Sequence, residues 1–190
     1  MEPRNPIPLV DIVVIDESQD MTLLYFELIV KMANDMCSLD NPLVKDEPHK
    51  FQLLVLGDYM QGLYEFKGAD IRFLTKASEI WSGLPHLLSP NFQQCVLKTS
   101  YRVTNQMAKF VNCDMLGEDR LVACREGTPV VYIRRSRYQI EKIVVYQIQR
   151  LLSEGESPSD IFVLGGSVKG ANSNIRHMEN VLTDADIPCH

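Results

Sequence analysis

The sequence has no long apolar run. Hydrophobic residues make up 45% of the chain, but no stretch of them approaches the ~20 residues that a membrane-spanning helix needs. The opening residues, MEPRNPIPLVDIVV, also lack the layout of a signal peptide, because Asp11 interrupts the apolar stretch and no small-residue cleavage site follows. We therefore expect an intracellular protein without a membrane partner, cytoplasmic in a prokaryote and nuclear in a eukaryote.

Cysteine patterns that indicate disulfides or metal sites are also missing. The chain has five cysteines, an odd number, and they are widely spaced. No CxxC pair or Cys/His cluster has the spacing of metal ligands. We assign no chemistry to these thiols.

An excess of basic charge is absent as well. The chain has 19 basic and 25 acidic residues and a formal net charge of −6. A protein that binds nucleic acid through its whole surface is usually basic. The balance argues against a simple DNA-coating module and leaves open a local strip of contacts within a larger protein. The basic group at Arg134, Arg135 and Arg137 is interpreted as a solvated strand end.

Short apolar strands and amphipathic helices alternate along the chain. The predicted strands are Leu9–Ile15, Phe51–Leu56, Val96–Lys98, Val130–Arg134 and Ile161–Leu164. The predicted helices are residues 21–35, Ile71–Trp81, a helix capped by Thr104 or Asn105 and running through Val111, Tyr138–Leu152 and Asn174–Leu182. This alternation indicates an α/β protein with a parallel sheet, which we expect to divide into two half-lobes near residues 93–98.

Several patterns within these elements predict burial. Leu9–Ile15 is nearly all apolar, which predicts a strand buried on both faces, and Ile161–Leu164 is interpreted as another buried strand. In the first helix, Leu24, Leu28, Ile29 and Met32 recur at helical spacing. Gly155 lies just beyond the helix Tyr138–Leu152, as a C-terminal cap does.

Two of the predicted strands end in acidic residues. Asp16 and Glu17 follow the first strand, and Asp58 follows the second. In open α/β sheets, ligands bind beyond the carboxyl ends of the strands. Carboxylates there can hold Mg²⁺ and orient an attacking water toward a phosphate. Many strands exit into acidic turns, so this pattern alone is a weak signal.

Three longer segments strengthen the signal from the acidic strand ends: VVIDESQD, LVLGDYMQGLYEFKGAD and TSYRVTNQMAKFVN. With these three segments the chain resembles the UvrD/Rep/PcrA-like superfamily 1 DNA helicases. The motifs II (DExQD), III (GDxxQxIYxFRGA) and IV (Tyr-Arg after a short strand) of that family occur in this order and spacing. The resemblance implies a RecA-like P-loop NTPase fold, α/β, with parallel sheets flanked by helices. Residues 1–95 would be the C-terminal part of a first RecA-like lobe, and residues 96–190 the N-terminal part of a second.

The resemblance implies a site for ATP and Mg²⁺. Asp16 would bind the Mg²⁺, and Glu17 would be the general base toward the hydrolytic water. Gln61 would sense the γ-phosphate through its amide. Tyr101 would stack on adenine, and Arg102 would stabilise charge on the γ-phosphate from the second lobe.

The resemblance also implies contacts with single-stranded DNA. Tyr64 and Phe66 would form a stacking platform for bases, with Lys67 beside them. The alternative for these two rings is packing in a hairpin. Gln19 and Asp20 are predicted to hydrogen-bond between motifs. Lys67 stands where the family usually has arginine, so it keeps the charge but loses the bidentate fork.

One family motif does not occur in the sequence. There is no GxxxxGK[ST] segment, and GGSVKG at Gly165–Gly170 has the wrong spacing. The triphosphate therefore lacks its main binding elements. We expect a fragment of an ATP-dependent DNA helicase with 3′–5′ polarity that is inactive alone, whose partners are single-stranded DNA, the remainder of the helicase, and accessory repair or replication proteins. The alternatives are a non-catalytic pseudo-helicase that binds nucleic acid or protein, and a motor acting on another track, such as RNA.

Overall fold

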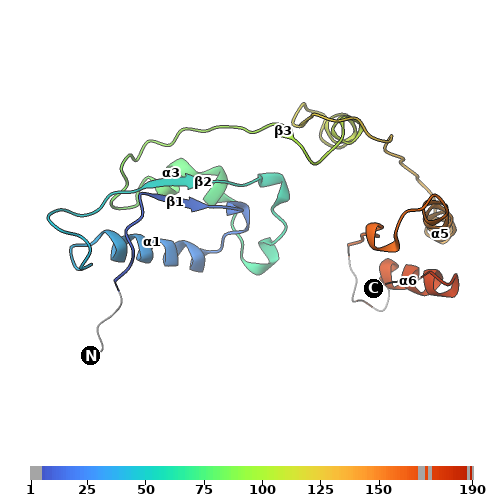
Figure 1. Ribbon diagram of the computed structural model, residues 1–190, viewed down its shortest axis with the longest axis horizontal. Coiled ribbons are helices and arrows are strands. Elements are labelled where there is room, and N and C mark those ends of the chain that lie inside the picture. The colour runs from blue at the N-terminus through green and yellow to red at the C-terminus, as the bar shows by residue number, and fades with distance from the viewer. Residues whose placement is uncertain (1–5, 167–169, 171–172, 188, 190) are drawn as a thin grey trace. The chain divides into compact units, whose positions relative to one another are not determined.

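The computed structural model describes residues 6–166, 170, 173–187 and 189 (Figure 1). The chain divides into two compact units, Met1–Leu97 and Lys98–His190. Their assignment to parts of two RecA-like lobes stays a prediction.

The first unit is built on two parallel strands. β1 (Ile12–Ile15) pairs with β2 (Gln52–Val55), with Ile12 opposite Gln52 and Ile15 opposite Val55. Helix α1 (Leu23–Cys37) connects the two strands, as a crossover between parallel strands requires. The predicted mixed α/β class with parallel pairing is confirmed at this level.

The helices of this unit pack on one face of the sheet. Val13 and Ile15 point into the helical layer, whereas Ile12, Val14 and Leu54 are 53%, 54% and 44% exposed. The prediction that the first strand is buried on both faces is therefore wrong. Successive side chains of a strand point to opposite faces, and the described residues of this unit supply a helical layer for only one of them.

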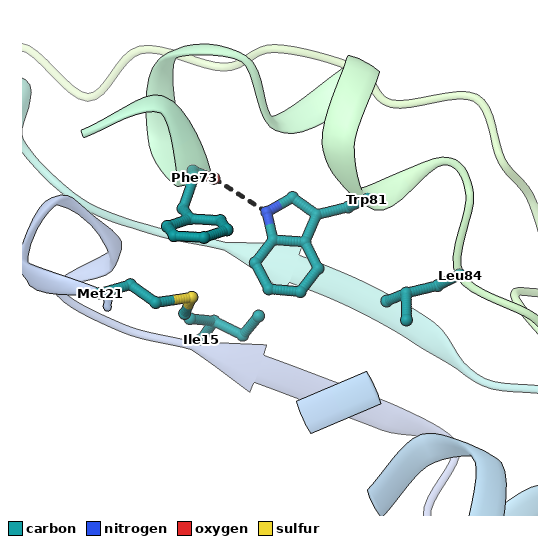
Figure 2. Packing of buried hydrophobic residues seen from close by; sticks show 5 residues of the cluster. All are labelled: Ile15, Met21, Phe73, Trp81 and Leu84. Carbon is teal, nitrogen blue, oxygen red and sulfur yellow. Dashed lines mark hydrogen bonds between the residues drawn. The ribbon is translucent and has the colours of Figure 1, made fainter. Parts of the chain in front are cut away.

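Trp81 lies at the centre of the core of this unit (Figure 2). It is fully buried, and its indole nitrogen donates a hydrogen bond to the carbonyl oxygen of Phe73 at 2.8 Å. The ring of Phe26, on α1, lies 5.0 Å from Trp81 and 5.1 Å from Phe73. The satisfied indole N–H lets this large side chain be buried without an unpaired donor.

Helix α1 forms where the sequence predicts it, but a different face is buried. Leu24, Leu28 and Met32 are 72%, 58% and 39% exposed, so their predicted inward orientation is wrong. The buried positions are Ala33, Met36 and Cys37, with Phe26, Ile29 and Val30 packed partly against the core. Burial raises the pKa of the Cys37 thiol.

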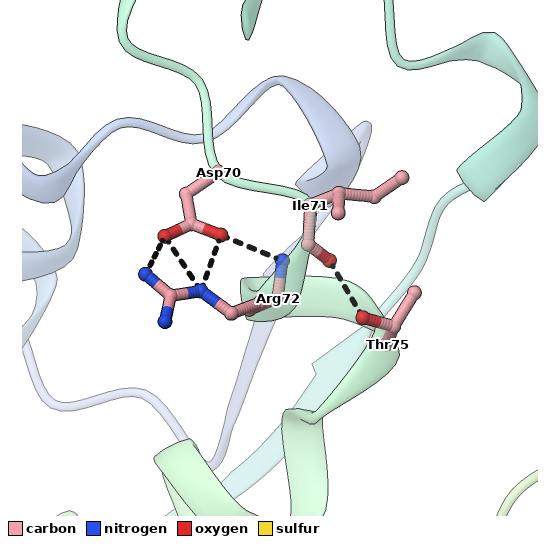
Figure 3. Close-up of polar contacts among 4 residues, drawn as sticks. All are labelled: Asp70, Ile71, Arg72 and Thr75. Atoms are coloured by element: carbon pink, nitrogen blue, oxygen red, sulfur yellow. Dashed lines mark hydrogen bonds and ion pairs between the residues drawn. The ribbon is translucent and has the colours of Figure 1, made fainter.

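The predicted helix Ile71–Trp81 is two short helices, α2 (Arg72–Thr75) and α3 (Ala77–Trp81), divided at Lys76. At the start of α2, Asp70 accepts three guanidinium hydrogen bonds from Arg72, two of them from Nε, and its Oδ1 also accepts one from the Arg72 backbone N–H at 3.0 Å (Figure 3). These hydrogen bonds hold the pKa of the Asp70 carboxyl below its ordinary value.

The second unit begins with another parallel pair, β3 (Thr99–Ser100) and β4 (Val122–Ala123). The predicted strand Val96–Lys98 is wrong, because the strand starts at Thr99. Thr104 caps α4 (Asn105–Lys109) by accepting from the Met107 amide at 3.3 Å. The helix continues as the π-helix η4 (Phe110–Leu116), beyond the predicted end.

Helices α5 (Arg137–Ser153) and α6 (Asn174–Asp184) form the remaining core of this unit. Ile148, Met178 and Leu182 are its centre. Gly155 has a φ of +99°, which fits its predicted place after the end of α5. The short 3-10 helix η5 (Pro158–Asp160) lies between the two helices in sequence.

The predicted strands Val130–Arg134 and Ile161–Leu164 are wrong. Neither segment is a strand, and Phe162 and Leu164 are 79% and 88% exposed. Of the GGSVKG segment, residues 167–169 lie outside the described part of the chain. Across the described residues, no helix combines the length and apolar character that crossing a bilayer takes.

Candidate functional site

The carboxyl ends of β1 and β2 lie side by side in the first unit. Beyond the strands, the Leu56 amide donates to the Ile15 carbonyl at 2.8 Å, and the Ser18 amide donates to the Leu56 carbonyl at 2.9 Å. These bonds continue the pairing of the two chains past their last strand residues. The segments that carry Asp16 and Asp58 therefore emerge together at one edge of the sheet.

Gln19 joins the two segments. Its Nε2 donates to Glu17 Oε2 at 2.6 Å, and its Oε1 accepts from the Asp58 backbone N–H at 3.0 Å. Gln19 lies in the 3-10 helix η1 (Ser18–Asp20) and is only 3% exposed. The predicted hydrogen bonding by Gln19 between the two segments is confirmed. Asp20 differs, since its Oδ1 is buried and has no hydrogen-bond partner.

Asp58 extends this network to Gln61. Its Oδ1 accepts from the Met60 amide at 3.0 Å, which caps the 3-10 helix η2 (Tyr59–Gln61), and its Oδ2 accepts from Gln61 Nε2 at 2.9 Å. A chain of hydrogen bonds thus links Glu17, Gln19, Asp58 and Gln61. The sequence did not predict this connecting role of Asp58, because it does not show which hydrogen-bond donors lie near an acidic residue at a strand end.

Position 57 requires a glycine, because the side chain of Gln19 passes close to the backbone there. A Cβ at this position would lie 2.4 Å from Gln19 Oε1 and 3.2 Å from the Ser18 backbone nitrogen. Gln19 can reach both partners only because residue 57 has no side chain. The glycine that follows the second strand is thus part of the site.

Glu17 has a strained backbone. Its φ of 51° and ψ of 41° place it in the left-handed region, which costs a non-glycine residue about 1–3 kcal/mol. The Glu17 amide donates to Asp16 Oδ1 at 2.9 Å, and both residues are exposed. Such strain clusters at functional sites, and it falls here on the residue predicted to be the general base.

The donor set at this edge suits a magnesium ion held mainly by a substrate. The described residues contain no group of three or more His, Cys, Asp or Glu side chains that could hold a metal. Mg²⁺ in phosphate-handling sites commonly takes one or two protein carboxylates together with substrate phosphates and water. The exposed carboxylate of Asp16, with that of Glu17 beside it, fits that arrangement and does not fit a metal cage made of protein ligands alone.

A second group of side chains, which we call the aromatic arm (Tyr64–Lys67), follows η2. Tyr64 and Phe66 are 43% and 79% exposed, with ring centroids 6.2 Å apart and planes tilted by 45°. Lys67 Nζ lies 4.8 Å from the centroid of Tyr64 and 5.6 Å from that of Phe66. Residues Glu65–Lys67 form the 3-10 helix η3, so the hairpin alternative for these rings is wrong.

The backbone of the aromatic arm is held in place. The carbonyl oxygen of Tyr64 accepts from the Lys67 and Ala69 amides at 2.8 and 3.2 Å. Ala69 forms an antiparallel bridge with Thr22, just before α1. The exposed rings therefore project from an anchored turn.

Tyr101 and Arg102 belong to the second unit, in the turn after β3. Both are exposed, Tyr101 by 81%. The backbone amide of Arg102 donates to Ser100 Oγ at 3.4 Å, and the Arg125 guanidinium donates to the Arg102 carbonyl. The structure thus brings Asp16, Glu17 and Gln61 to one edge of the first unit, and it holds Tyr101 and Arg102 on a turn of the other unit.

Residues 9–81 match the family model described as the UvrD/REP helicase N-terminal domain. This segment contains the strand-end edge and the aromatic arm, and Tyr101 and Arg102 lie outside it. A comparison with curated proteins gave no match. The family match supports similarity to a UvrD-like helicase, a class that acts on nucleic acid with ATP.

Proposed function

We propose that this chain is a fragment of an ATP-dependent DNA helicase, in which ATP hydrolysis is coupled to 3′–5′ movement on single-stranded DNA. One observation carries the proposal: the segments after β1 and β2 are joined side by side through Gln19. This joint places Glu17 and Gln61 in one hydrogen-bond network, and the match to the UvrD/REP model covers that whole segment.

The exposed side chains at this edge suit the terminal phosphates of ATP. Asp16 would hold Mg²⁺, which neutralises charge on the phosphate oxygens. Glu17 is exposed and accepts from Gln19, so its carboxylate is oriented to take a proton from an attacking water. Gln61 contacts the γ-phosphate through its amide. Tyr101 stacks on adenine, and Arg102 supplies positive charge to the γ-phosphate.

The aromatic arm suits the bases of a single strand. Stacking on aromatic side chains is sequence-tolerant, because every base has a π face. The Lys67 ammonium lies beside both rings and can contact a phosphate of the same strand. Only two residues separate Gln61 from Tyr64, the first residue of the arm, so a change at Gln61 is passed along a short backbone path to the DNA contact.

The absence of a GxxxxGK[ST] motif from the sequence favours a second candidate function. Without this phosphate cradle, the chain by itself binds ATP weakly and does not unwind DNA. The alternative is therefore a non-catalytic module that binds single-stranded DNA through the aromatic arm. Both candidates predict DNA binding, and they differ in nucleotide turnover when the cradle is supplied by another polypeptide.

DNA binding tests the part that both candidates share. We expect Phe66→Ala to weaken binding of a fluorescent oligo(dT) between about fivefold and about 150-fold in an anisotropy titration, since base stacking contributes about 1–3 kcal/mol. Phe162→Ala is the matched control, because Phe162 is also 79% exposed and lies outside the proposed site. Equal effects of the two substitutions would contradict the assignment of the arm.

Phosphate release separates the two candidates. The full chain is mixed with a polypeptide that carries the GxxxxGK[ST] segment of a UvrD-like helicase, and phosphate release is measured with and without oligo(dT). A motor fragment gives DNA-stimulated release that Glu17→Gln abolishes. A non-catalytic module gives none, although its DNA affinity remains.

A further inference from the structure

The turn that carries Tyr101 and Arg102 is flanked by a second segment from later in the chain. We call residues 122–127 the strap. β4 pairs with β3 directly before the turn, with Thr99 opposite Val122 and Ser100 opposite Ala123. The Val122 amide donates to the Lys98 carbonyl at 2.9 Å. The strap therefore fixes the backbone on the N-terminal side of Tyr101.

The strap also fixes the turn itself and its exit. The Arg125 guanidinium donates to the Arg102 carbonyl, and the Arg125 carbonyl accepts from the Asn105 amide at 2.8 Å. Asn105 is the first residue of α4, so one strap residue contacts the turn on both sides of Thr104. The backbone of Arg102 is thereby held in place, while the residue stays exposed.

Glu126 and Gly127 complete these contacts. Glu126 accepts from Asn105 Nδ2 and Gln106 Nε2, each at 2.6 Å, and the two hydrogen bonds lower the pKa of its carboxyl. The Gly127 amide donates to Gln106 Oε1 at 2.8 Å. A Cβ on Gly127 would lie 2.3 Å from Thr104 Cγ2, so the strap approaches the start of α4 as closely as a glycine permits.

We propose that Arg125 and Glu126 are positioning residues, which hold the Tyr101–Arg102 turn in one conformation so that both exposed side chains are preorganised for a ligand. The part of this proposal that concerns ATP rests on the proposed function. A binding group contributes most when its backbone and neighbours are already fixed, because less conformational freedom is lost on binding. An exposed arginine on an unsupported turn would lose that freedom each time it bound.

Amide hydrogen exchange on the full chain, followed residue by residue by NMR, tests the positioning. Asn105 and Gln106 donate to different oxygens of Glu126. Glu126→Gln replaces one of these oxygens with an NH₂ group, so one of the two donors then faces another donor. Arg125→Met removes the contact to Arg102. We expect either variant to speed exchange at Arg102 and Asn105 at least about tenfold, and Arg125→Lys to restore part of the protection.

Two comparisons make this result specific. Arg134→Met, at an exposed arginine outside the strap, is expected to leave these rates unchanged. The amides of Leu121 and His177, which donate to Asn112 Oδ1 and the Ser173 carbonyl, are expected to exchange as in the parent chain. Unchanged rates at Arg102 and Asn105, or an equal rise at all four amides, would overturn the proposal.

A titration of the same samples with ATP and Mg²⁺ at millimolar concentration tests the function separately. We expect shifts at Tyr101 and Arg102 in the parent chain, and an affinity at least about threefold weaker in Glu126→Gln but unchanged in Arg134→Met. If the parent chain shows no shifts while the exchange result holds, the nucleotide assignment fails and the positioning stands. If affinity is the same in all variants, preorganisation for ATP is overturned.

Discussion

Gln19 reaches its two partners through space that a side chain on residue 57 would fill. A Cβ there would lie 2.4 Å from Gln19 Oε1 and 3.0 Å from Leu74 Cδ2. We therefore expect Gly57→Ala to destabilise the first unit by about 1–3 kcal/mol, the usual cost of overpacking, and to displace Gln19 from Glu17. Urea unfolding followed by the fluorescence of Trp81, the single tryptophan of the chain, measures the effect.

Gly83→Ala is the control for this substitution. The nearest atom to a Cβ at Gly83 is the Ile80 carbonyl oxygen at 3.9 Å, which is an ordinary contact. Alanine there is expected to be neutral or slightly stabilising, because it restricts the unfolded chain. Equal losses at the two glycines would mean that the close approach to Gln19 does not limit residue 57.

The Asp70–Arg72 contact makes the stability of the first unit depend on pH. Hydrogen bonds from Arg72 lower the pKa of Asp70 in the folded state. The ionised carboxylate therefore stabilises the folded chain at pH values above about 3.9, the pKa of an aspartate in the unfolded chain. This contribution is present above that pH and is lost as the pH falls through the folded pKa. We expect Asp70→Asn to lower the urea midpoint at pH 7 and to have little effect near pH 2.

Urea midpoints of the parent and the variant across this range, again from Trp81 fluorescence, measure the difference. Asp46→Asn, at an exposed acid in the loop before β2, serves as the matched control and should change neither end of the range. A constant gap between the parent chain and Asp70→Asn down to pH 2 would contradict the assignment.

The prediction for Gln19 succeeded although its partner Asp58 lies 39 positions away. Gln19 lies two residues after a strand-end acid, and adjacent parallel strands bring their ends together. The strap was missed because no such pattern marks it. Arg125 and Glu126 contact residues about twenty positions earlier in the chain, and residues 113–128 have no periodicity that would indicate a partner.

At the scale of elements, helices were predicted better than strands. α5 and α6 form close to their predicted bounds, because helical hydrogen bonds join residues four apart and need no distant segment. Val130–Arg134 and Ile161–Leu164 have strand composition, but a strand exists only where a neighbour pairs with it. The sequence also does not show how many helical layers cover a sheet, so burial of Ile12 and Val14 was predicted wrongly.

Because helices cover only one face of the sheet, we expect two neighbouring residues of β2 to contribute differently to stability. Leu53 packs against both core clusters of the first unit, and Leu54 is 44% exposed on the opposite face. Leu53→Ala is expected to cost about 2–4 kcal/mol, and Leu54→Ala less than about 1 kcal/mol. Urea unfolding measures both. A cost at Leu54 as large as that at Leu53 would show that a second layer covers the exposed face in solution.

At the scale of the whole molecule, net charge limits how the proposed DNA contact can work. The formal charge of −6 opposes a polyanion, so binding must rest on stacking by the aromatic arm and on a small number of local cations. Each phosphate neutralised on a single strand contributes a slope of about −0.7 to the plot of log affinity against log salt concentration. Lys67 is the one cation that we assign to the arm.

A shallow salt dependence is therefore expected. The slope for oligo(dT) binding to the full chain should lie between about −0.7 and about −1.4, and Lys67→Ala should reduce its magnitude by about 0.7. Phe66→Ala should lower the affinity at every salt concentration and leave the slope unchanged, because a ring releases no counterions. Anisotropy titrations between 20 and 300 mM salt, roughly the range over which screening changes most, provide the measurement. A slope steeper than about −3, or one unaffected by Lys67→Ala, would place the DNA contact on another basic surface.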